Sequence, residues 1–198
     1  MEETAKILVL ESDWRSAPHL LPTQRYSTAK CYASIGLQIQ SVPLIVTAFK
    51  KTLEHFLSQP INKKGINVII LSGHAGFENQ TLQMAAVDQL FEPLEIFESL
   101  QSKLLRSILI LDACFLGLQL ELFMRRFPLL GCIGFTKQVN WVSSSILVLI
   151  LLRHFREMGV FEMRRKSAIR PRKILEQLQN NSTQHLVQQL GFNFLFSK

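Results

Sequence analysis

The 198-residue chain has few of the features that mark secreted, zinc-binding or membrane-spanning proteins. It contains three cysteines, Cys31, Cys114 and Cys132, and no Cys-x-x-Cys pair. A disulfide framework or a cysteine-based metal site is therefore not expected, and a reducing cytoplasm is the natural compartment. The longest apolar run, 146–152, has seven residues, whereas a spanning helix needs roughly 20, so we expect no membrane crossing. The start, Met-Glu-Glu-Thr-Ala-Lys, lacks the basic and apolar stretches of a signal peptide.

Nine glycines and seven prolines are too few for a fibrous or low-complexity chain. With 47% hydrophobic and 19% charged residues, the composition is that of a globular domain with a substantial core. The net charge of +7 is compatible with an anionic partner. Much of the excess lies in one segment, Arg164 to Lys173, for which a solvated loop and helix start is the simpler interpretation.

Short apolar runs alternate with stretches of helical periodicity along the chain. The apolar runs predict strands over residues 6–10, 37–42, 67–71, 108–111 and 131–135. The periodic stretches predict helices over residues 23–34, 47–57, 92–105, 118–126, 143–158 and 173–190. This order predicts an α/β fold, a three-layer α/β/α sandwich with a mostly parallel central sheet. We expect residues 1–162 to form this domain and the basic segment 163–198 to pack on it, with 191–196 as an edge strand.

Two of the predicted strands end in residues that carry chemistry. The run 66–71 leads into Ser72-Gly73-His74-Ala75-Gly76, and the run 108–111 leads into Asp112-Ala113-Cys114. If the two strands are parallel neighbours, His74 and Cys114 meet at the carboxyl edge of the sheet, where open α/β sheets place their sites. An imidazole beside a thiol can take its proton and make it a nucleophile.

The residues around this pair fit an acyl-transfer site. Gly73 and Gly76 would allow positive φ and a close approach of substrate backbone. The backbone N–H groups of Ala75, Gly76 and Cys114 could stabilise a developing oxyanion. Asp112 points to the same side of its strand as Cys114 if the strand continues that far, which makes it a candidate floor for a pocket that takes a basic side chain.

The two motifs, Ser-Gly-His-Ala-Gly and, some 40 residues later, Asp-Ala-Cys-Phe-Leu-Gly, resemble those of the caspase-like (clan CD) cysteine peptidases. The likeness is closest to the bacterial caspase-like and CHAT branches, which are related to metacaspases and separases. It extends over about residues 5–160 by order of elements. The resemblance implies a caspase-haemoglobinase-like fold, with His74 as general base, Cys114 as nucleophile and Asp112 as the acid that selects Arg or Lys.

The resemblance also implies an endopeptidase that needs no metal or other cofactor for its chemistry, although calcium switches on some relatives. Its partners would be a protein substrate and a separate sensor or regulatory protein, in bacterial defence or programmed cell death. We expect Asp13, together with Glu11, to cap a loop or to form a secondary rim of the basic-residue pocket. The other histidines, His19, His55, His154 and His185, lack partners at ligand spacing, and we expect no metal site.

The family usually has glycine after the histidine, where this chain has Ala75, and a small polar residue after the cysteine, where it has Phe115. These departures leave an alternative open, a catalytically decayed interaction domain. Such a domain would bind a partner protein, or nucleic acid through the segment Arg164 to Lys173. That segment is also a candidate for self-cleavage.

Overall fold

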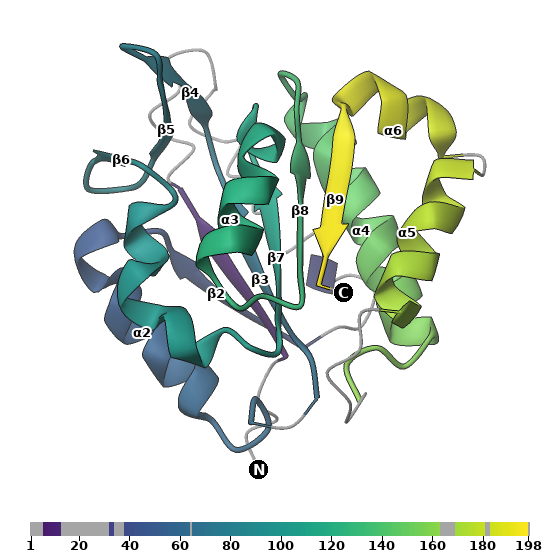
Figure 1. Ribbon diagram of the computed structural model, residues 1–198, viewed down its shortest axis with the longest axis horizontal. Coiled ribbons are helices and arrows are strands. Elements are labelled where there is room, and N and C mark those ends of the chain that lie inside the picture. The colour runs from purple at the N-terminus through teal and green to yellow at the C-terminus, as the bar shows by residue number, and fades with distance from the viewer. Residues whose placement is uncertain are drawn as a thin grey trace.

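The computed structural model describes residues 6–12, 32–33, 38–63, 65–162, 169–180 and 183–197. Its centre is a six-stranded sheet in the order β2-β1-β3-β7-β8-β9 (Figure 1). All neighbours in this sheet are parallel except β9, which pairs antiparallel with β8. The fold is therefore α/β with a mostly parallel sheet, as the alternation of apolar runs and helical periods predicts.

The strands lie close to the predicted ranges. Continuous apolarity in β3 and β7 fits strands that are covered on both faces, and every residue of these two strands is buried. β2 is partly exposed, as its alternating sequence and its place at the edge of the sheet require. The strands of this sheet are β1 (Ile7–Glu11), β2 (Ile39–Pro43), β3 (Asn67–Ser72), β7 (Ser107–Asp112), β8 (Gly131–Phe135) and β9 (Phe192–Phe196).

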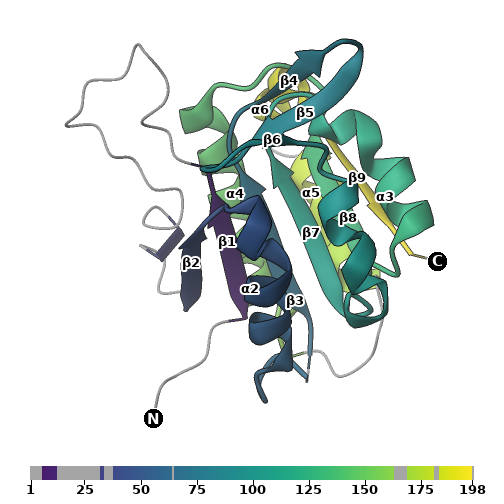
Figure 2. The same cartoon turned by 90° about the vertical axis from the view of Figure 1, so that its left-hand side faces the viewer.

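Helices cover both faces of the sheet, which is compatible with a three-layer sandwich (Figures 1 and 2). One core lies between the sheet and α4 (Trp141–Glu157), α5 (Ile169–Asn180) and α6 (Gln184–Leu190). The other lies under α2 (Val46–Ser58), η2 (Glu95–Lys103), η3 (Leu116–Gln119) and α3 (Leu120–Arg126). The C-terminal elements thus share a core with the strands, and 191–196 contains the expected edge strand.

Three features differ from the sequence prediction. Residues 75–91, to which the sequence prediction assigns neither strand nor helix, form a small antiparallel sheet of β4 (Ala75–Glu78), β5 (Thr81–Ala85) and β6 (Leu90–Phe91). The helix expected over 92–105 is a 3-10 helix, and the one expected over 173–190 is two helices. The predicted helix 23–34 falls mostly outside the described residues.

Candidate active site

The strands that carry His74 and Cys114 are parallel neighbours. β3 pairs with β7 in a register that sets Ser72 opposite Asp112, and the ladder extends one step further, where Gly73 N donates to Asp112 O at 3.2 Å. His74 lies two residues after Ser72, and Cys114 lies two residues after Asp112. Both residues therefore leave the same edge of the sheet, from adjacent strands.

His74 is the link between the central sheet and the small one. It is exposed, and its carbonyl oxygen accepts a hydrogen bond from Ala85 N at 2.9 Å, which begins the β4–β5 ladder. Although the side chain reaches solvent, the surrounding protein desolvates the ring and lowers its pKa below the usual 6.5. A histidine with a lowered pKa is mostly neutral at pH 7, which is the form that accepts a proton.

Cys114 is half-buried and lies against the loop that precedes α4. Val139 N donates a hydrogen bond to Cys114 Sγ at 3.3 Å, and the thiol lies 3.9 Å from Val139 O. An N–H aimed at sulfur is a contact that an anionic sulfur accepts more strongly than a neutral one. Cys132 differs, because it is fully buried in β8 and burial raises the pKa of its thiol. Of these two cysteines, Cys114 is the one with access to a substrate.

Asp112 is a buried carboxyl group directly below this edge, with only 2% of its surface exposed. Burial raises its pKa from 3.8 to about 6, against the hydrogen bonds that lower it, and the negative charge of Glu11 adds to the rise. Tyr32 and Ser72 donate their hydroxyl groups to Asp112 Oδ2 at 3.1 and 3.2 Å. The Ser144 hydroxyl lies close enough to lower the pKa as well, but it donates its hydrogen bond to Trp141 O and not to the carboxyl group.

Asp112 Oδ1 is buried and has no hydrogen-bond partner among the residues that the structure describes. Glu11 stands on the same side of the sheet, since the registers align Glu11, Ser72 and Asp112 across β1, β3 and β7. The same face therefore carries two carboxyl groups on either side of Ser72.

The two glycines that flank His74 do not work as predicted. Neither Gly73 nor Gly76 has a positive φ, so the expectation of left-handed backbone there is wrong. Gly73 is needed for space, because a Cβ at this position would lie 2.4 Å from Ser12 Oγ. Gly76 has open space where a Cβ would stand, with no atom within 4 Å. The close packing of β3 against β1, rather than an unusual dihedral, explains the first of these residues.

The ladder between β4 and β5 separates the two predicted oxyanion donors. Antiparallel pairs alternate between hydrogen-bonded and non-bonded positions. Because His74 bonds to Ala85, the next bonded pair is Gly76 with Gln83, and the intervening Ala75 turns its N–H away from β5. Ala75 is thus the better placed of the two candidates, together with the backbone N–H of Cys114.

The residue after the cysteine adopts an unusual conformation. Phe115 has φ 64°, in the left-handed region that favours glycine. Its ring packs against that of Phe77 on β4, with centroids 5.6 Å apart. This contact joins the segment that follows His74 to the segment that follows Cys114, so the two strand ends converge above the sheet.

The sequence prediction missed several residues that shape this site. The sequence could have indicated Ser72 as a site residue, because it is a polar residue at the end of an apolar strand. Tyr32, Val139 and Phe77 gave no local signal, since their roles depend on contacts with residues 25 to 80 positions away or in another element. Asp13 and Cys31 lie outside the described residues, as do Arg164, Arg165 and Lys166 of the basic segment.

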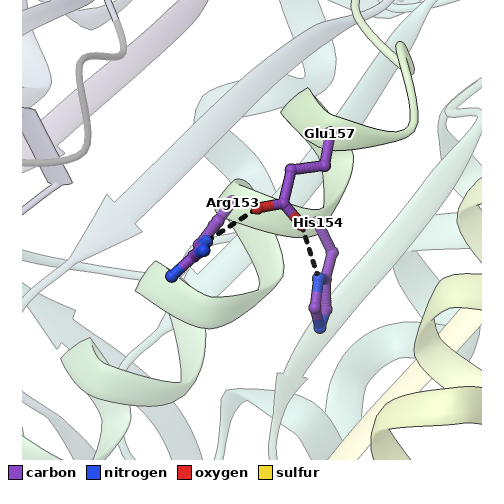
Figure 3. Close-up of polar contacts among 3 residues, drawn as sticks. All are labelled: Arg153, His154 and Glu157. Carbon is purple, nitrogen blue, oxygen red and sulfur yellow. Dashed lines mark hydrogen bonds and ion pairs between the residues drawn. The ribbon is translucent and has the colours of Figure 1, made fainter.

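Another histidine, His154, lies partly exposed on the surface. His154 stands on the last turn of α4, with Nδ1 3.5 Å from Glu157 Oε2, while Arg153 Nε donates to Glu157 Oε1 at 2.8 Å (Figure 3). Within the described part of the chain, no three His, Cys, Asp or Glu side chains are grouped as a metal site would require. No helix in that part is long and apolar enough to cross a membrane.

Comparisons with known proteins do not extend this description. No protein-family model matches the chain, and a search among curated proteins finds no match.

Proposed function

We propose that the protein is a cysteine endopeptidase with a caspase-like fold that hydrolyses peptide bonds after Arg or Lys. The observation that carries this proposal is the register of β3 and β7, which brings His74 and Cys114 to the same edge of the sheet from neighbouring strands. The lowered pKa of His74 supports its role as a base. The half-buried Sγ of Cys114, held by Val139 N, supports the role of nucleophile.

The reaction follows from these positions. His74 takes the thiol proton of Cys114, and the sulfur attacks the carbonyl carbon of the substrate. The N–H groups of Ala75 and Cys114 stabilise the oxyanion of the tetrahedral intermediate. When the C–N bond breaks, the imidazolium gives its proton to the leaving amine. His74 then removes a proton from water, whose oxygen attacks the thioester, and the released thiol takes the proton back.

The preference for a basic residue rests on Asp112. A buried carboxyl group with one unpartnered oxygen is unfavourable by itself, and a guanidinium or ammonium group would supply the missing donors. Glu11, on the same side of the sheet, adds negative charge. The resemblance to CHAT-type proteins further favours an effector in bacterial defence or programmed cell death that a separate regulator activates.

The test uses peptides that differ only in having Arg, Lys or Asp at one position, with cleavage followed by mass spectrometry. Arg and Lys peptides should be cut after that residue, and the Asp peptide should not. The variants Cys114→Ala and His74→Ala should each lower the rate by at least about 1000-fold. Cys132→Ala is the matched control, because this cysteine is buried away from the edge, and it should retain activity.

A thiol-reactive peptidyl-Arg probe separates this function from the decayed interaction domain. An enzyme should be labelled at Cys114, and the labelling should depend on His74. Failure to cleave any peptide, together with equal labelling of the cysteines, would contradict the proposal and favour a domain that only binds a partner.

A further inference from the structure

Two aromatic rings meet beside the candidate active site. Phe77 lies on β4, three residues after His74, and Phe115 directly follows Cys114. Their ring centroids are 5.6 Å apart, with the ring planes inclined at 50°. Each ring belongs to one of the two segments that carry the candidate catalytic residues, so the pair is close in the chain to both of them.

The backbone fixes the position of the second ring. Phe115 has φ 64°, which is unfavourable for any residue with a Cβ and persists only when neighbouring contacts hold it. Phe115 N donates to Lys137 O at 3.2 Å, and Phe115 O accepts from Leu118 N at 2.9 Å. These bonds hold the residue at the sheet edge, where its ring is half-buried and meets Phe77.

The first ring is largely in water. Phe77 is 57% exposed, although it is a large apolar side chain. Single exposed hydrophobic residues are common on protein surfaces. Phe77 differs in that its ring already has one aromatic partner. An apolar substrate side chain that packed beside the two rings would bury more apolar surface, with little further loss of conformational entropy in the protein.

The chemistry decides which substrate residue reaches this pair. His74 gives its proton to the leaving amine, so the leaving group lies on the His74 side of the scissile bond. Phe77 belongs to β4, the strand that directly follows His74, so we expect its ring on the same side of the bond. We propose that Phe77 and Phe115 form an apolar subsite for an aliphatic or aromatic side chain on the first residue of the leaving group. This inference rests on the proposed function.

The experiment varies one residue at a time around a fixed Arg. One peptide set carries Leu, Phe, Ser or Asp immediately after the Arg, and a second set carries the same residues immediately before it. The subsite predicts kcat/KM about tenfold higher for Leu and Phe than for Ser in the first set. In the second set, the relative kcat/KM values of the four peptides should stay the same when Phe77 is altered.

Three variants make the result specific. Phe77→Ala should remove most of the preference in the first set, and Phe77→Leu should restore part of it. Phe115→Gly, which removes the ring and accommodates φ 64°, should have the same effect as Phe77→Ala. Leu90→Ala is the matched control, because Leu90 is also 57% exposed but lies on β6, at the other edge of the small sheet, and should leave the preference unchanged.

The outcomes distinguish this inference from the function on which it rests. Binding of the same peptides to Cys114→Ala, followed by fluorescence anisotropy, is measured in parallel. Cleavage after Arg without a preference for Leu or Phe in the first set would overturn the subsite alone. Preferential binding that depends on Phe77, without cleavage by the wild type, would overturn the peptidase function alone. No binding and no cleavage would overturn both.

Discussion

Asp112 is the residue with the most unusual environment in the candidate site. Its carboxyl group is buried, accepts hydrogen bonds from Tyr32 and Ser72 on one oxygen, and has a pKa of about 6. In the unfolded chain the same group has its ordinary pKa of 3.8. At pH values between 3.8 and 6, folding therefore binds a proton at Asp112. The stability that protonated Asp112 contributes is lost as the pH rises through 6.

Replacement of Asp112 by Asn should make this titration visible. The pKa difference corresponds to about 3 kcal/mol. The free energy of unfolding of Asp112→Asn, relative to the wild type, should therefore rise by about this amount between pH 4 and pH 7. Urea denaturation at a series of pH values measures it. Glu95→Gln, which alters an exposed carboxyl group on η2, is the matched control. A constant difference for Asp112→Asn would mean that folding does not change the pKa of this group.

Elements, rather than single residues, determine how Cys114 is presented. The short 3-10 helix η3 follows Phe115 and crosses β8 so closely that a Cβ on Gly117 would lie 2.6 Å from the backbone carbon of Phe135. Backbone atoms cannot move aside as a flexible side chain can. The position of η3, and with it the turn that contains Cys114 and Phe115, therefore depends on the missing side chain at Gly117.

The two glycines of the site motifs should respond differently to substitution. Gly117→Ala should lower the free energy of unfolding by about 1–3 kcal/mol, because overpacking forces η3 away from β8. It should also slow the labelling of Cys114 by a peptidyl probe. Gly76→Ala meets no atom within 4 Å and should change stability by no more than about 0.5 kcal/mol. Thermal and urea denaturation of both variants provide the comparison, and similar losses in the two would contradict the packing argument.

At the scale of the whole molecule, the last strand closes the sheet. β9 runs antiparallel to β8, and the ring of Phe196 lies over Gly131, where a Cβ would come within 2.4 Å of it. Arg172 of α5 donates to the carbonyl oxygens of Phe196 and Ser197 at 3.3 and 3.4 Å. The end of the described chain is thus joined to both the sheet and a covering helix.

Removal of the Phe196 ring should therefore affect the whole fold. Phe196→Ala should lower the free energy of unfolding by about 3 kcal/mol, a large share of the 5–15 kcal/mol typical of a domain. Phe194→Ala is the matched control on the same strand, and its smaller burial should make the loss about 1 kcal/mol. Equal losses, measured by urea denaturation, would show that burial of Phe196 does not decide the stability of this edge.

The sequence by itself determined the strands that carry the candidate site. A parallel strand covered on both faces needs an unbroken apolar run, and the runs before His74 and Cys114 are local enough to be recognised. The segment 75–91 could not be recognised in the same way, because its strands are short and β5 alternates buried and partly exposed residues instead of forming an unbroken apolar run. Its polar outer positions therefore resemble a loop.

Only the tertiary structure decided the environment of the reactive groups. The burial of Asp112, the hydrogen bond from Val139 N to Cys114 Sγ, and the contact of Phe77 with Phe115 all depend on residues far apart in the chain. The amide directions at Ala75 and Gly76 likewise depend on the register with β5. Burial and orientation are properties of the packed chain, so the order of residues shows which groups are present but not what surrounds them.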